Sequence, residues 1–268
     1  MLIQKLKNSL KQVIKAYLLK NNIYVSKTTP YSNLVSFLTL LKPMETNYEL
    51  IRIGGDTDGG YLIPNDLKGI DTCFSPGVST TSDFENDLTK KGIKCFLADY
   101  SVDAPPIDNP LFDFEKKYLG TDNDDTFITL ESWVNQKAPK KDEFLLQMDI
   151  EGSEYPVIFH TSEDTFSKFR ILVIEFHGLD TILTKEGYEL MRSTFSKLLK
   201  NFEVVHIHPN NCCGSAYYKD LVIPRVMEFT FLRKDRITHK APAKNFPNQL
   251  DRKNVAAHQD IHLPSCWY

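Results

Sequence analysis

Residues 1–20 combine apolar and basic positions at helical spacing. The apolar positions recur every three or four residues, and they are Leu2, Ile3, Leu6, Leu10, Val13, Ile14, Tyr17 and Leu18. Five lysines and no acidic residue occur among the other positions. The pattern predicts a basic amphipathic helix. Two roles for it stay open: it packs on the rest of the chain or on a second copy, or it binds a membrane surface or a partner protein.

From residue 50 onward, short apolar runs alternate with turns and with stretches of helical spacing. Strands are expected near residues 71–75, 93–98, 112–118, 144–150, 171–176, 203–208 and 226–233. Helices are expected over residues 32–41, 82–91, 129–137, 155–167 and 186–200, the first of them stopped by Pro43. This alternation is typical of an α/β protein with a mostly parallel seven-stranded sheet flanked by helices.

The same pattern divides the chain into three parts. Residues 1–49 form an N-terminal helical extension, and residues 50–238 form the α/β domain. Residues 239–268 are rich in Pro, Asn, Asp and His, which indicates an irregular segment packed on the domain.

Charge and cysteine content narrow the possible functions. The 268 residues carry a net charge of −3, so no overall field attracts nucleic acid or an anionic membrane, and a small substrate is a better match. Five cysteines, an odd number without a Cys-x-x-Cys spacing, favour a reducing cytoplasm over a disulfide framework. We expect neither a signal peptide, because lysines interrupt the N-terminal apolar residues, nor a transmembrane segment, since no run approaches about 20 apolar residues.

The loop after the first expected strand is a candidate cofactor site. Ligands of open α/β sheets bind beyond the carboxyl ends of the strands. This loop, residues 75–81, has a single glycine, Gly77, and lacks the G-x-G-x-x-G run of dinucleotide-binding proteins. Asp99 ends the second strand about 20 residues later, the spacing expected of an acid that binds ribose hydroxyls. The sequence therefore favours a nucleoside cofactor without a pyrophosphate.

Acidic residues and histidines lie at the ends of three further expected strands. Asp149 and Glu151 are at the end of one strand, Glu175 and His177 at the end of the next, and His206 and His208 at the end of the third. Because side chains alternate along a strand, the members of each pair point the same way. Carboxylates and imidazoles from adjacent strand ends suit a divalent metal or an acid/base site, and a purely structural polar network is the alternative.

With these residues in place, the chain resembles the FkbM-type methyltransferase family over roughly residues 50–235. The resemblance rests on Asp58-Gly59-Gly60-Tyr61, Gly77-Val78-Ser79 with Phe84-Glu85, Thr129-Leu130-Glu131, Met148-Asp149-Ile150-Glu151-Gly152-Ser153-Glu154, Glu175-Phe176-His177 and His208-Pro209-Asn210-Asn211. It implies a Rossmann-like methyltransferase fold that binds S-adenosylmethionine at Gly77, Ser79, Asp99 and Asp149. It also implies methyl transfer to oxygen, often on sugars of polyketides or surface polysaccharides.

The expected reaction is methylation of a sugar hydroxyl in the cytoplasm, on a nucleotide-linked sugar or a surface polysaccharide precursor. Asp149, His177 and His208 are the expected catalytic residues, with a histidine as general base. A divalent metal, magnesium or manganese, is the alternative means of activating the hydroxyl, held by Asp149, Glu175 and His208. Nucleic acid is not an expected partner, whereas a homo-oligomer formed through the N-terminal helix is.

Two other functions remain under consideration. A nicotinamide-dependent oxidoreductase can use the same fold and an acid at the position of Asp99, but the single-glycine loop counts against it. A non-catalytic binding domain could use the basic N-terminal helix to reach a partner. The clustered Asp, Glu and His residues would then serve no purpose, which favours the methyltransferase.

Overall fold

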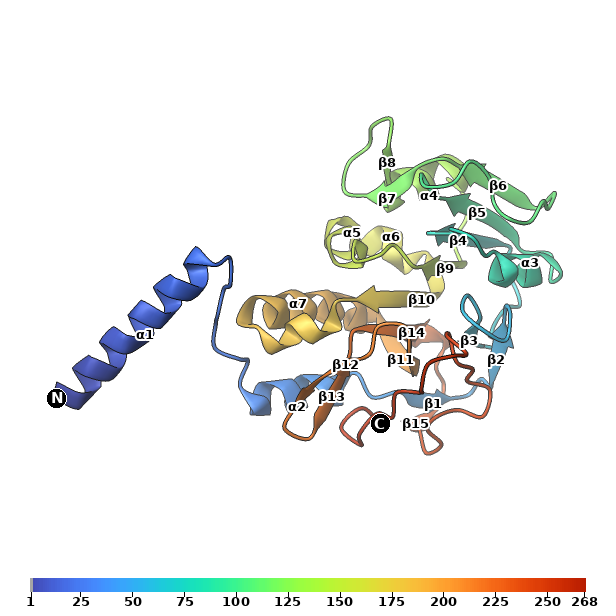
Figure 1. Ribbon diagram of the computed structural model, residues 1–268. Coiled ribbons are helices and arrows are strands. Elements are labelled where there is room, and N and C mark those ends of the chain that lie inside the picture. Colours follow the sequence, from blue (N-terminus) through green and yellow to red (C-terminus); the bar gives the residue numbers. More distant parts are fainter. Residues whose placement is uncertain (1) are drawn as a thin grey trace.

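A seven-stranded sheet forms the centre of the molecule (Figure 1). The computed structural model describes the backbone of residues 2–268 and the side chains of residues 9–268. The sheet has the order β11-β14-β10-β9-β4-β5-β6. Its strands are β4 (Thr72–Pro76), β5 (Lys94–Ala98), β6 (Phe112–Glu115), β9 (Phe144–Met148), β10 (Phe169–His177), β11 (Phe202–Pro209) and β14 (Val226–Arg233). Only β14 runs antiparallel to its neighbours, which confirms the predicted α/β fold and its mostly parallel sheet.

Alternating side chains of the strands enter two separate cores, one on each face of the sheet. Phe74 and Leu146 point into the larger core, while Cys73 and Leu145 point into the smaller one. Both faces are covered, which explains why these strands are continuous apolar runs. The larger core lies under α2 (Tyr31–Leu40), α4 (Leu130–Lys137), α5 (Glu154–His160), α6 (Glu163–Ser167) and α7 (Lys185–Asn201). The smaller lies under α3 (Asp83–Thr89) and the hairpin of β2 (Leu50–Ile53) and β3 (Tyr61–Pro64).

The helix expected over residues 155–167 is two helices, α5 and α6. The chain is extended at Thr161 and Ser162, and the Ser162 side chain accepts a hydrogen bond from the backbone N–H of Thr165. An N-terminal cap of this kind starts a new helix. The apolar spacing continues across the break, which is why the sequence pattern did not reveal it.

Several short strands were not predicted. They are the β2–β3 hairpin, β1 (Met44–Thr46), which pairs with β15 (Lys240–Pro242), β7 (Tyr118–Gly120), which pairs with β8 (Phe127–Thr129), and the hairpin of β12 (Ser215–Tyr218) and β13 (Leu221–Pro224). Two 3₁₀ helices, η1 (Leu179–Leu183) and η2 (Lys234–Arg236), complete the elements. The β1–β15 pair brings together the segments before and after the central sheet.

The N-terminal segment is helical, as predicted, and forms α1 (Leu2–Lys20). Figure 1 shows that α1 extends away from the sheet and from the helices that cover it. Among the helices of residues 2–268, none combines the length and the hydrophobicity needed to cross a bilayer.

Candidate active site

The loop after β4 lies against the end of β9. Gly77 has a φ of +91°, which a residue with a side chain rarely adopts. A Cβ atom at this position would lie 1.6 Å from the carbonyl oxygen of Asp149. Only glycine lets the two backbones approach so closely, so this residue sets the shape of the site.

Asp99, at the end of β5, holds the same loop in place. Its side chain is buried and accepts a hydrogen bond of 2.8 Å from the backbone N–H of Ser79. The other carboxylate oxygen accepts hydrogen bonds from the backbone N–H and the hydroxyl of Ser101, at 2.8 Å and 2.7 Å. Oδ2, which accepts only the hydrogen bond from Ser79, has a further lone pair available to a ligand.

A cavity of about 500 Å³ opens between these elements. Its wall consists of Gly77, Ser79, Ala98, Asp99, Ser101, Tyr118, Leu119, Phe127, Asp149, Ile150, Glu151 and Ser153. The volume lies in the range of small-molecule sites. The four expected cofactor residues, Gly77, Ser79, Asp99 and Asp149, therefore lie around one cavity.

The aromatic wall of this cavity was not anticipated from the sequence. Tyr118 lies on β7 and Phe127 on β8, and the centres of their rings are 5.8 Å apart. The sequence pattern extended the third strand through residue 118 and left residue 127 in a loop. The only sign of this wall in the sequence was the presence of the two aromatic residues.

Next to the cavity, carboxylates surround the ring of His177. Its Nε2 atom lies 3.8 Å from Asp149, 3.4 Å from Glu151 and 3.8 Å from Glu175. One ligand atom from each of Asp149, Glu151 and His177 falls within 4.8 Å of the others. This is a geometry in which one cation or one exchangeable proton can be shared.

Glu154, a residue that sequence reasoning quoted only in a motif, fixes the His177 ring from the other side. Its Oε1 atom lies 3.1 Å from Nδ1 of His177 and also accepts hydrogen bonds from the backbone N–H groups of Ile150 and Gly152. The Glu154 side chain is completely buried. A proton on Nδ1 directed at Glu154 leaves Nε2 free to face Asp149 and Glu151.

Burial and mutual repulsion shift the pKa values in this cluster. Burial raises the pKa of Asp149 to about 7, with the negative charges of Glu151 and Glu154 acting in the same direction and His177 opposing them. Burial also raises the pKa of Glu175 well above its usual range. For His177, burial alone would lower the pKa, but the hydrogen bond with Glu154 and the surrounding carboxylates raise it. Such shifts are typical of functional sites.

Three buried carboxylate oxygens around His177 have no hydrogen-bond partner among the described residues. They are Oδ1 of Asp149, Oε2 of Glu154 and Oε2 of Glu175. Glu175 is otherwise oriented by Asn210, whose side-chain amide donates to its Oε1 at 3.0 Å. Buried oxygens of this kind need a proton or a cation to compensate their desolvation.

A second set of polar residues, of which Asn254 and Glu228 are buried, lies beside the cluster. Asn254 donates hydrogen bonds to Asp58 at 3.0 Å and to Glu228 at 2.7 Å, and its side-chain oxygen lies 3.1 Å from Nε2 of His208. Of these residues, only Asp58 and His208 belonged to motifs noted in the sequence. Asn254 comes from the C-terminal segment and Glu228 from β14, so neither followed an expected site strand.

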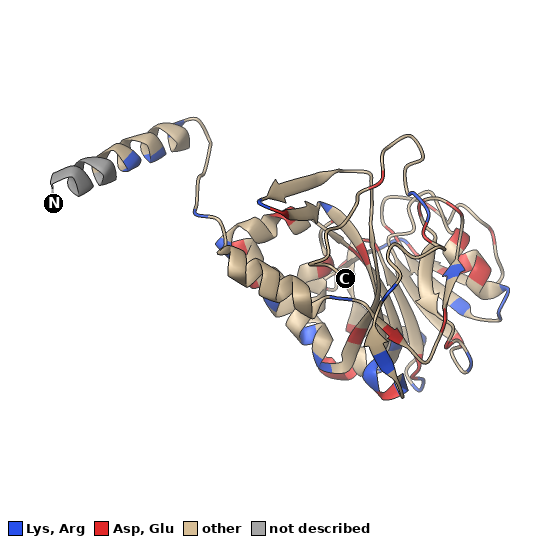
Figure 2. Ribbon diagram, turned by 90° about the horizontal axis from the view of Figure 1, so that it is seen from below, with Lys and Arg blue, Asp and Glu red and all other residues tan. Residues whose placement is uncertain are grey.

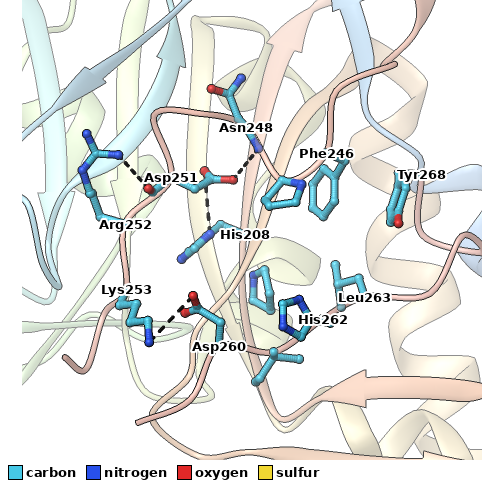
Figure 3. A pocket seen from close by; sticks show the side chains of 13 residues that line it. His208, Phe246, Asn248, Asp251, Arg252, Lys253, Asp260, His262, Leu263 and Tyr268 are labelled. Carbon is cyan, nitrogen blue, oxygen red and sulfur yellow. Dashed lines mark hydrogen bonds and ion pairs between the residues drawn. The ribbon is translucent and has the colours of Figure 1, made fainter. Parts of the chain in front are cut away.

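His208 is not part of the cluster around His177. The sequence interpretation placed their strands next to each other, but β14 lies between β10 and β11. His208 lines a different cavity, of about 360 Å³, under the C-terminal segment, where Figure 3 shows it beside Asp251. His206 also contacts Asp251, at 2.8 Å. The structure therefore brings together Asp149, Glu175 and His177, and separates His208 from them.

One family model matches part of the chain. Residues 106–202, which contain β9, β10 and the His177 cluster, match the family model of the methyltransferase FkbM domain. No curated protein sequence matches the chain.

Two solved structures are similar to the chain at a low level. The fibrillarin/Nop5p complex is 13% identical, covers 62% of this chain and 78% of its own, and has a TM-score of 0.37. The Methanococcus jannaschii fibrillarin pre-rRNA processing protein is 9% identical, covers 70% and 83%, and also has a TM-score of 0.37. Neither bears on the acceptor. The match of residues 106–202 to the FkbM domain agrees with the resemblance that the motifs indicated, and it supports a methyltransferase that uses S-adenosylmethionine.

Proposed function

We propose that this protein is an O-methyltransferase that acts on a sugar hydroxyl. The observation that carries the proposal is the position of the His177 cluster. Asp149 and Glu151 line the 500 Å³ cavity and also contact His177, so a proton-accepting group lies beside the cofactor cavity. A hydroxyl needs such a group, because it is a poor nucleophile near neutral pH.

The residues of the 500 Å³ cavity suit the methyl donor, S-adenosylmethionine. Oδ2 of Asp99 has a free lone pair for a ribose hydroxyl, and Tyr118 and Phe127 offer ring faces for adenine. Gly77 and Ser79 bring backbone close to the remainder of the molecule. S-adenosylmethionine held there supplies a methyl group on a positively charged sulfur.

In the simpler form of the proposal, His177 is the general base. Glu154 keeps Nδ1 protonated, so Nε2 is the atom that accepts the proton of the sugar hydroxyl. Asp149, whose pKa burial raises to about 7, can share this proton near neutral pH. His208, the other histidine considered, faces Asn254 and Asp251 instead.

The second form of the proposal adds a divalent cation, magnesium or manganese. Asp149, Glu151 and His177 would hold it, with Glu175 beside them. The unpartnered oxygens of Asp149 and Glu175 support this assignment. Glu154 then has the role that carboxylates commonly play toward a ligating histidine, fixing the ring by its other nitrogen. A bound cation would lower the pKa of the sugar hydroxyl.

We propose that the cavity under the C-terminal segment binds the part of the acceptor molecule that lies beyond the methylated sugar hydroxyl. Figure 3 shows Arg252, Lys253 and His262 around it, together with the ring of Phe246. Cationic groups with an aromatic ring suit a sugar that carries a phosphate or nucleotide. Because all five cysteines are free thiols, we place the reaction in the cytoplasm.

Product analysis tests the proposal. The protein is incubated with labelled S-adenosylmethionine and a panel of nucleotide sugars, with and without chelator, and the products are analysed by mass spectrometry. We expect one added methyl on a sugar fragment, and loss of product in Asp149→Asn and His177→Gln but not in the exposed control Glu163→Gln. A methyl on a protein side chain, a lipid amine or a nucleobase would contradict the proposed acceptor.

The chelator distinguishes the two forms of the mechanism. If activity disappears on chelation and returns with magnesium or manganese, the cation belongs to the site. Full activity after exhaustive chelation would leave His177 as a metal-free base.

A further inference from the structure

Helix α1 exposes a row of large apolar side chains. Leu10, Val13 and Tyr17 are 62%, 64% and 67% exposed, and Ile14 is exposed as well. Positions three, four and seven residues apart lie on one side of a helix, so these four side chains form one stripe. The exposure continues after the helix at Ile23, Tyr24 and Val25. Single exposed apolar residues are ordinary, but a continuous stripe of this size indicates a binding surface.

The body of the protein does not cover this stripe. Figures 1 and 2, which view the molecule from perpendicular directions, both show α1 extending away from the sheet and its helices. The hydrogen bonds that residues 9–25 make in the structure stay within the segment, as from Asn21 to Tyr17. Going along the chain from residue 9, hydrogen bonds to the body begin at Thr28 and Thr29, where the Thr29 hydroxyl donates to the carbonyl oxygens of Ile182 and Thr184.

The charge of the segment has a single sign. Lys11 and Lys15 lie one turn apart on a side of α1 away from the stripe, and Lys20 ends the helix. The first acidic residue of the whole chain is Glu45. In Figure 2 the charged positions on the described part of α1 are all blue. The complementary partner is therefore a surface that is both apolar and negatively charged.

We propose that α1 binds to the surface of an anionic lipid bilayer. The stripe of Leu10, Val13, Ile14 and Tyr17 enters the interface between headgroups and acyl chains, and the lysines contact lipid phosphates. An apolar stripe on a helix whose charges are all basic is the arrangement of interfacial membrane helices. Tyr17 and Tyr24 add amphipathic rings of the type enriched at this depth. The helix lies on the membrane and does not cross it, in keeping with its composition.

Vesicle flotation with the full-length chain tests the proposal. We expect the protein to float with vesicles of phosphatidylcholine and phosphatidylglycerol, and to bind pure phosphatidylcholine at least about tenfold more weakly. Rising salt should weaken the binding, because it screens the lysines. The apolar variant Leu10→Asp with Tyr17→Asp should lose binding to both kinds of vesicle.

A matched pair of charge variants distinguishes an effect of the lysines on α1 from an effect of the protein's net charge. Lys11→Glu with Lys15→Glu should weaken binding to the anionic vesicles by at least about tenfold. Lys91→Glu with Lys140→Glu changes the net charge equally at exposed positions of the body, and should bind like the wild type. Because the stripe is exposed, all variants should unfold at the wild-type temperature.

Fluorescence provides an independent readout. The two tryptophans, Trp133 and Trp267, are buried, so a Tyr17→Trp variant places an additional indole on the stripe. Its emission should shift to the blue when anionic vesicles are added. Absence of vesicle binding, or equal loss in both charge variants, would overturn the proposal. So would a self-association of the wild type that Leu10→Asp abolishes without any vesicle binding, because the stripe would then cover a second copy.

Discussion

The carbonyl oxygen of Asp149 occupies the space that a side chain at Gly77 would need, 1.6 Å from an ideal Cβ position. The contact joins the cofactor loop to the strand end that carries the His177 cluster. We predict that Gly77→Ala lowers the free energy of unfolding by about 3 kcal/mol or more, because a backbone shift must be added to the cost of a positive φ. It should also abolish binding of S-adenosylmethionine. Chemical denaturation and calorimetry measure the two effects.

Gly92 is the matched control for this substitution. It too has a positive φ, of +81°, but its Cβ would meet nothing within 4 Å. Gly92→Ala should therefore cost only about 1–2 kcal/mol, the price of the backbone conformation alone, and leave cofactor binding intact. Equal costs at the two positions would show that the contact with Asp149 is unimportant.

The second prediction concerns Asp99. Asp99→Asn keeps the size of the side chain but removes its charge, and should weaken binding of S-adenosylmethionine and S-adenosylhomocysteine alike by about 1–3 kcal/mol. Asp103→Asn, at an exposed aspartate bound to Lys116, serves as the control. Calorimetry decides the matter. Unchanged affinity in Asp99→Asn together with tight NAD binding by the wild type would favour the oxidoreductase.

The central sheet could be predicted because its physical cause is local. Strands buried on both faces must be apolar along their length, and the runs at β4, β5, β9 and β10 stand out for that reason. The polar residues at the ends of these strands then identified Asp99, Asp149 and His177. Residues that end buried strands are conspicuous in a sequence.

The position of His208 could not be predicted because it depends on strand order. β14 comes last of the seven strands in the sequence and pairs on both sides, so it separates β10 from β11. Neighbouring strands lie about 4.8 Å apart, which puts roughly 10 Å between the strands of His177 and His208. No local pattern near His208 contains this information. The same applies to Asn254, which reaches Glu228 from the irregular C-terminal segment.

The third prediction assigns a positioning role to Glu154. Glu154→Gln weakens the hydrogen bond that orients His177, so kcat should fall about 10-fold to 100-fold while affinity for S-adenosylmethionine stays unchanged. The hydrogen bond also raises the pKa of His177, so the acidic limb of the pH–rate profile should move to lower pH in the variant. Kinetics across pH measure both effects. An unchanged profile with reduced thermal stability would indicate a purely structural role.

The fourth prediction follows from the surroundings of His208. Burial opposes its charge, but Glu228 on β14 and Asp251 in the C-terminal segment outweigh burial and raise its pKa from 6.5 to about 9. A raised folded-state pKa stabilises the fold fully below the unfolded value of 6.5, and this contribution is lost as the pH rises through about 9. His208→Gln should therefore cost up to about 3 kcal/mol more at pH 6 than at pH 10. Chemical denaturation of both proteins across this range measures the difference, with His160→Gln, at an exposed histidine, as control. A difference that does not vary with pH would show that His208 is neutral in the folded protein, and that Glu228 and Asp251 are balanced by other groups.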